Sequence, residues 1–151
     1  MQDLKEFLFD QDYVRVKLKK TATNHFVIKA KINTTKGRFI VDTGASKSCV
    51  GTSDSERFEI ETEASDHKAS GAGPTEIDTL ISQKNKISIG KYSLKKLALI
   101  LIDLSHINAA LEKQGVEPVQ GIIGADVLLK GKALIDYDKK YLYLLNKIKR
   151  K

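Results

Sequence analysis

The sequence predicts a mainly β domain, a closed barrel or sandwich with one or two short helices. Short runs in which apolar and polar residues alternate recur along most of the chain, and turn-forming residues separate them. The longest apolar run, Leu97 to Ile102, has the length of one buried strand. At 151 residues the chain is long enough to bury one core, so a single domain is expected.

The first 20 residues are expected to extend a main domain that covers residues 21–151. Leu4, Phe7 and Leu8 have helical spacing, which indicates a short N-terminal helix or arm. Residues 13–19 alternate strictly and predict a half-buried strand. This extension could add an interface, cover a cleft or extend the sheet, and the sequence leaves the three open.

A hairpin is expected next, because residues 26–32 and 38–41 both have strand character. The segment from Asn33 to Gly37 reads as the turn between them, with Gly37 able to adopt a positive φ. The hairpin places Asp42 directly after its second strand. Residues 53–70 are polar and poorly patterned, with short strands expected around 58–60 and 66–69.

The second half of the chain continues the β pattern. Further strands are expected at residues 76–81, 86–89, 97–104, 119–123, 133–135 and 141–145. A helix is expected from about His106 to Gln114, begun by Asp103 or Ser105 and ended by Gly115. A helical turn is expected over residues 125–130.

The tripeptide Asp42-Thr43-Gly44 is the first segment with chemical meaning. Three apolar residues bring the Asp42 carboxylate to the end of a buried strand. Thr43 adds a small hydroxyl, and Gly44 permits a tight turn and close approach to a ligand. Taken alone, the tripeptide also fits an ordinary turn in which the aspartate accepts backbone N–H bonds.

A second segment changes that balance. Gly121-Ile122-Ile123-Gly124, followed by Ala125-Asp126-Val127-Leu128, comes about 80 residues later, and a glycine after a buried Ile-Ile pair suits a close backbone crossing. Together with Asp-Thr-Gly-Ala-Ser and a glycine-bearing hairpin between them, the ordered set resembles the retropepsin-like (clan AA) aspartic proteases, of the cellular bacterial type. The resemblance runs from about His25 to Leu145.

The resemblance implies a role for each motif residue. Asp42 is the expected catalytic carboxylate. The residues expected to support the catalytic loop are Thr43, Gly44, Ala45 and Ser46. The expected substrate-binding flap contains Gly71, Ala72 and Gly73. The residues expected to pack beneath the loop as structure are Ile122, Ile123 and Gly124.

The implied activity is that of an aspartic endopeptidase acting on peptide or protein substrates. Two carboxylates about 3 Å apart would share one proton and activate a water molecule, without a metal or cofactor. The chain has one Asp-Thr-Gly, so a homodimer would supply the second Asp42. Asp136 and Asp138 lie in an expected hairpin, where turn and edge-strand roles are favoured. The alternative is a catalytically inactive peptide-binding or assembly module of the same fold.

Two positions depart from the viral members of that family. Ser46 stands where they carry an aspartate that contacts substrate, and Ala125-Asp126 stands where they carry an arginine that braces the dimer. The way in which the dimer is held is therefore left open.

The net charge of +7 raises the question of an anionic partner. Lysine and arginine are spread along the chain and cluster only in residues 147–151. This distribution argues against nucleic-acid binding, which needs basic residues gathered on one face, and favours a solvated tail.

Other partners and sites are not favoured by the sequence. No apolar run could span a membrane, and the N-terminus lacks a secretory pattern, so a cytoplasmic protein is expected. The single cysteine, Cys49, excludes an internal disulfide and is expected to be buried as an apolar residue. The three histidines are scattered, so no metal site is expected.

Overall fold

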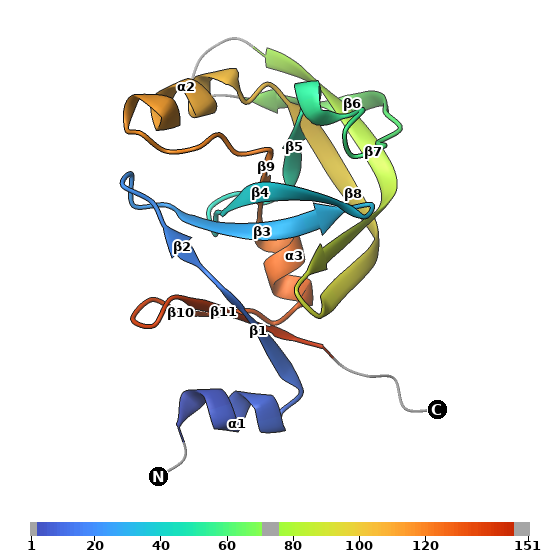
Figure 1. Ribbon diagram of the computed structural model, residues 1–151. Helices are drawn as coiled ribbons and strands as arrows, with labels where there is room; N and C mark the ends of the chain where they lie inside the picture. Colours follow the sequence, from blue (N-terminus) through green and yellow to red (C-terminus); the bar gives the residue numbers. More distant parts are fainter. Residues whose placement is uncertain (1–2, 71–75, 147–151) are drawn as a thin grey trace.

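The chain forms a closed β-barrel with a smaller sheet beside one end (Figure 1). The computed structural model describes residues 3–70 and 76–146, with the backbone alone for residues 63–70 and 76–79. An eight-stranded sheet in the order β2-β3-β4-β9-β5-β8-β7-β6 is closed by an additional pairing of β3 with β7. The predicted mainly β, closed-barrel fold is confirmed.

The bounds of the elements are as follows. The strands of the barrel are β2 (Lys19–Lys20), β3 (Phe26–Ile32), β4 (Thr35–Val41), β5 (Cys49–Gly51), β6 (Glu63–Ser70), β7 (Glu76–Ile89), β8 (Tyr92–Ile102) and β9 (Gly121–Ile123). The small sheet, in the order β1-β11-β10, consists of β1 (Tyr13–Lys17), β10 (Leu134–Asp136) and β11 (Tyr141–Leu145). The helices are α1 (Leu4–Asp10), the 3-10 turn η1 (Thr52–Asp54), α2 (Ser105–Lys113) and α3 (Ala125–Lys130).

The N-terminal extension pairs with the C-terminal hairpin. Asp3 caps α1 by accepting a hydrogen bond from the Glu6 N–H at 2.8 Å, and β1 then runs antiparallel to β11. In Figure 1, α1 and this small sheet lie below the barrel, with α2 at the opposite end. The boundary at residue 20 stays a prediction. Within the described residues, no helix combines the length and apolar character needed to cross a bilayer.

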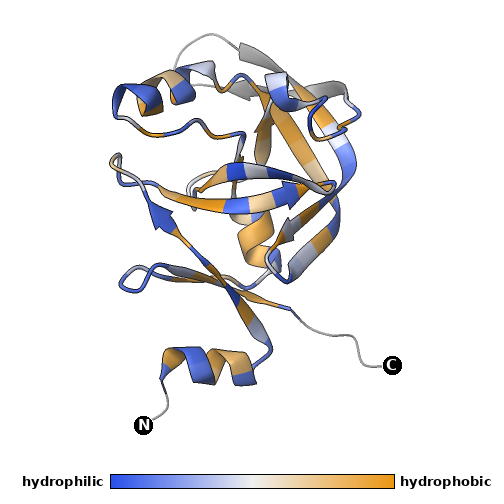
Figure 2. Cartoon of the chain, in the orientation of Figure 1, coloured by the Kyte–Doolittle hydropathy of each residue, from blue (hydrophilic) through white to orange (hydrophobic). Residues whose placement is uncertain are grey.

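The β3–β4 hairpin has two different faces, visible as alternating colours in Figure 2. Inward side chains such as Ile28, Ile32 and Phe39 join the main core inside the barrel. On the outer face, Val27 and Ile40 pack with residues of α2 and the segment after it to form a second, smaller core. Burial of each large apolar side chain contributes about 1.5–3 kcal/mol, so α2 is held against the barrel by this cluster.

The predicted turn of this hairpin is wrong in position. The tight turn is Asn33-Thr34, where φ is +49° and +86°, and β4 begins at Thr35. Gly37 lies inside β4. A Cβ atom at this position would come within 2.8 Å of the Phe58 ring. Its glycine therefore makes room for an aromatic side chain and does not serve a turn.

Two further expectations about strands need correction. Residues 58–60 do not form a strand: Phe58 is fully buried at the end of a series of turns that follows η1. The two strands expected at 76–81 and 86–89 are one long strand, β7, with irregular pairing to β8 between Ser82 and Ile87. The expected helix is present as α2, with Gly115 at a φ of +71° after its end.

Candidate active site

The backbone of Asp42 is fixed by two strands that are far apart in sequence. β4 and β9 run parallel, with Ile40 opposite Ile122 and Val41 opposite Ile123. The N–H of Asp42 continues this ladder by donating to the Ile123 carbonyl at 2.9 Å. The pairing of two buried apolar strands therefore determines where the aspartate leaves the sheet.

The loop that follows is tight and exposed. The N–H of Gly44 donates to Oδ1 of Asp42 at 2.9 Å, and the N–H of Ala45 donates to the Asp42 carbonyl at 3.2 Å. Asp42, Thr43, Gly44 and Ser46 are all exposed, and Ala45 is half-buried. The carboxylate thus has one oriented oxygen and lies open at the surface of the single chain.

The start of α3 supports this loop from behind. The N–H of Ala125 donates to the Ala45 carbonyl at 2.7 Å. Gly124 is buried against the same segment, and a Cβ atom there would lie 2.6 Å from the Ala45 oxygen and 3.0 Å from the Lys47 carbonyl. Only a glycine lets the two backbones approach this closely. Ile123 is fully buried beneath the loop, whereas Ile122 packs outward on the α2 side.

Buried Ser48 and half-buried Asp126 form a link that the sequence did not reveal. The Ser48 hydroxyl donates to Oδ1 of Asp126 at 2.7 Å and accepts from the Gly124 N–H at 2.9 Å. The Ser48 N–H donates to the other carboxylate oxygen, Oδ2, at 3.0 Å. An acidic residue in the first turn of a helix after a buried glycine was the available indication, but its partner lies 78 residues away.

Cys49 is buried beside this link. Burial, opposed by a hydrogen bond with the backbone of Ile122 and reinforced by the negative charges of Asp126 and Asp42, raises the pKa of its thiol to about 11. The thiol is therefore protonated at neutral pH and is a poor nucleophile. The prediction that Cys49 is a buried apolar residue is confirmed.

The remaining predicted residues are not brought to the Asp42 loop. Gly71, Ala72 and Gly73 lie outside the described residues. Asp136 accepts a hydrogen bond from the Lys139 N–H at 2.9 Å within its own turn, which is the structural role expected of it, and Asp138 is exposed. Across residues 3–70 and 76–146, no three His, Cys, Asp or Glu side chains gather as metal ligands would.

The Asp42 loop fixes the backbone at the end of β4 and orients one oxygen of the Asp42 carboxylate. The Gly44 N–H orients Oδ1, while Oδ2 has no hydrogen bond among the described residues. Such a carboxylate can accept a proton from water, or donate one when protonated.

Comparisons with known proteins bear on the family and the fold of the chain. A family model described as aspartyl protease matches residues 28–127. A retropepsin-like aspartic protease from Rickettsia conorii superposes with a TM-score of 0.57 and 21% identity, over 87% of each chain. The EIAV protease complexed with the inhibitor HBY-793 superposes with a TM-score of 0.55 and 19% identity, over 78% of this chain and 98% of that one.

A third structure, the retroviral protease-like domain of Ddi1 from Leishmania major, has a TM-score of 0.55 and 18% identity, over 85% of this chain and 92% of that one. None of the curated proteins matches the chain. At these identities the solved structures show the fold, whereas the family model covers most of the chain. The protein belongs to the aspartyl protease family and has the retropepsin-like fold.

Proposed function

We propose that the protein is an aspartic endopeptidase in which Asp42 is the catalytic residue. The observation that carries the proposal is the Asp42 loop: its exposed carboxylate is oriented by the Gly44 N–H, and its backbone is bonded to the distant segment 123–125. The support from β9 and α3 is consistent with a loop whose position matters for function.

A second copy of the chain completes the site in this proposal. One Asp-Thr-Gly is present, and the reaction needs two acids in contact. Two large apolar side chains in α3 and β10 remain exposed: Leu129 is 76% exposed and Leu134 is 44% exposed. They are consistent with a surface that a partner covers. Thr43, beside Asp42, would then meet its counterpart at a two-fold axis.

The reaction follows from a pair of carboxylates that holds one proton. The ionised Asp42 takes a proton from a bound water, whose oxygen attacks the carbonyl carbon of the peptide bond. The protonated Asp42 of the other copy donates to the carbonyl oxygen. Collapse of the tetrahedral intermediate breaks the C–N bond; the leaving nitrogen takes the proton that the first Asp42 removed from water, and the second Asp42 recovers a proton from the hydroxyl of the intermediate.

A flap over the substrate is part of the proposal. β6 and β7 pair as antiparallel arms as far as Ser70 and Glu76. The glycines between them, Gly71 and Gly73, suit a hairpin that closes over a peptide. Ser46 and the flap would contact substrate backbone, and the apolar residues near the loop would accept apolar substrate side chains.

Cleavage of a complex peptide mixture tests the proposal. Wild type, Asp42→Asn and Asp136→Asn are incubated with the mixture across about pH 4 to 7, where carboxylate pairs exchange their proton. Mass spectrometry should find cuts made by wild type and by Asp136→Asn that are absent with Asp42→Asn. Asp136→Asn is the matched control, because it also removes one carboxylate at the end of a strand.

The alternative, an inactive peptide-binding module of the same fold, predicts a different outcome. Wild type would leave the mixture intact at concentrations where sedimentation shows a dimer, yet would still retain peptides. Cuts that persist with Asp42→Asn would contradict the proposed catalytic residue.

A further inference from the structure

The outer face of the β3–β4 hairpin changes character halfway along its length. In the ladder, Val27 lies opposite Ile40, and this pair is covered by α2. The next two outward pairs are Lys29 opposite Arg38 and Lys31 opposite Lys36. Like charges directly opposite each other on neighbouring strands are destabilising. A negatively charged ligand that binds over these two pairs would reduce their repulsion.

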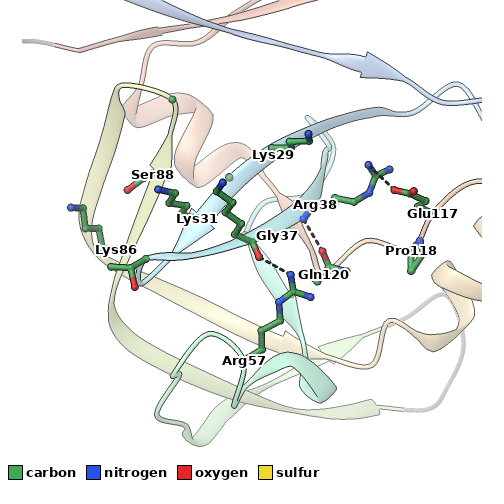
Figure 3. A pocket seen from close by; sticks show the side chains of 14 residues that line it. Lys29, Lys31, Gly37, Arg38, Arg57, Lys86, Ser88, Glu117, Pro118 and Gln120 are labelled. Carbon is green, nitrogen blue, oxygen red and sulfur yellow. Dashed lines mark hydrogen bonds and ion pairs between the residues drawn. The ribbon is translucent and has the colours of Figure 1, made fainter.

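Neighbouring segments add further cations to the same face (Figure 3). β7 pairs with β3 beside Lys31 and contributes Lys86, while the turn after η1 contributes Arg57. These residues surround a hollow of about 970 Å³. We call the set the basic face; it consists of Lys29, Lys31, Lys36, Arg38, Arg57 and Lys86.

The protein itself neutralises little of this charge. Glu117 is the one acidic residue that lines the hollow in the described part of the chain, and it pairs with Arg38 at 3.2 Å. Its side chain is 75% exposed, and exposed ion pairs contribute about 0–1 kcal/mol. Within the same described part, Nε of Arg38 is buried without a hydrogen-bond partner. Arg57 donates to the Lys36 carbonyl at 2.7 Å and lies near the negative charge of Asp54, but it forms no ion pair within 4.0 Å among the described residues.

The positive surface continues beyond this hollow. A second one, of about 640 Å³, shares Lys29 and Arg38 with the first. Its other cations are Lys17, Lys19, Lys20 and Lys140. The two hollows together form an extended basic track across β2, β3 and β4.

We propose that the basic face binds the phosphate backbone of a double-stranded nucleic acid. Eight of the ten cations around the two hollows are lysines, and neither lining contains an aromatic side chain among the described residues. Lysine is depleted at protein–protein interfaces, where aromatic anchors dominate, whereas phosphate contacts are made by basic residues spread over a surface. Single strands are bound through base stacking on aromatic rings, which this face lacks.

The basic face is separate from the Asp42 loop. Arg38 precedes Asp42 by four residues of extended chain, a distance of about 13 Å at the rise of a strand. The proposal therefore does not depend on proteolysis. The proposal departs from the sequence-based argument against nucleic acid, because basic residues that are scattered along the chain lie on one face in the fold.

Fluorescence anisotropy with a labelled duplex of about 20 base pairs tests the proposal across a range of salt concentrations. DNA and RNA duplexes of the same sequence are both used, since their backbones share the phosphate. With the six cations engaged, log K should fall against log salt with a slope of up to about −5. The variant Lys29→Gln/Lys31→Gln/Lys36→Gln/Lys86→Gln should bind at least tenfold more weakly, and its slope should be smaller by about 3 to 4.

Two control variants remove the same charge elsewhere. One carries Gln at Lys5, Lys95, Lys113 and Lys130, none of which lines either hollow. The other carries Gln at Lys147, Lys149, Arg150 and Lys151. Both should bind the duplex within about threefold of wild type. The basic-face variant should melt at the same temperature as wild type or higher, because it relieves like-charge repulsion.

Three results would overturn the proposal. Equal losses in all three variants would mean that net charge alone governs binding. Loss confined to the Lys147 to Lys151 variant would place binding on the tail. Tighter binding of polyglutamate than of either duplex, lost in the basic-face variant, would identify an acidic polypeptide as the partner.

Discussion

Asp42 directly follows β4 and Asp136 is the last residue of β10, yet the loops that begin at these two residues are supported differently. Each carboxylate accepts a local backbone hydrogen bond: Asp136 from the Lys139 N–H, three residues later, and Asp42 from the Gly44 N–H, two residues later. The loop of Asp42 depends on Ile123, Gly124 and Ala125, about 80 residues away. The turn at Asp136 is local, whereas the backbone of the Asp42 loop has long-range support as well, which favours a functional role for the loop.

Of the substitutions that test this difference, Gly124→Ala should have the largest effect on stability and cleavage. The added Cβ atom would lie 2.6 Å from the Ala45 oxygen, so the loop or α3 must move. We expect a loss of stability of about 2–4 kcal/mol, together with weakened cleavage. Urea denaturation measures the stability, and a change below about 0.5 kcal/mol would mean that the close approach is not needed.

Ser48→Ala should have an intermediate effect. It removes the hydroxyl that joins Asp126 to the Gly124 N–H, and it leaves that buried N–H without its acceptor. The expected loss is about 1–3 kcal/mol. Ser46→Ala, two residues earlier and exposed, is the matched control and should change stability by less than about 0.5 kcal/mol. Equal effects of the two substitutions would remove the proposed role of the link between Ser48 and Asp126.

Asp136→Ala should have the smallest effect. It removes one exposed hydrogen bond inside a turn, so we expect a loss of about 0.5–1 kcal/mol and unchanged cleavage per folded molecule. Denaturation and the peptide assay, run together, separate the two quantities. A selective loss of cleavage would show that Asp136 acts in the reaction, and the contrast with Asp42 would fail.

The sequence predicted what depends on local pattern. Alternation placed the β3–β4 hairpin and its delivery of Asp42, and the ordered motifs led to the family. Gly37 was misplaced because Phe58, which occupies the space beside it, lies 21 residues later and in a turn. No local pattern predicts which side chain fills such a space.

Long-range pairing accounts for the other omissions. The bond from Ser48 to Asp126 joins two unremarkable positions that meet only when β5 and α3 pack against the Asp42 loop. The basic face was missed for the same reason, since strand register sets Lys29 opposite Arg38 and Lys31 opposite Lys36. The positions of lysine and arginine in the sequence do not show which of them lie side by side on neighbouring strands.

Mixing wild type with Asp42→Asn in varied proportion, under conditions of free subunit exchange, most directly tests a site shared by two copies of Asp42. If each active site needs both carboxylates, activity should follow the square of the wild-type fraction, so an equal mixture retains about a quarter of the wild-type rate. A rate that falls linearly, to about a half, would mean that each chain works with its own carboxylate, and the shared site would be contradicted.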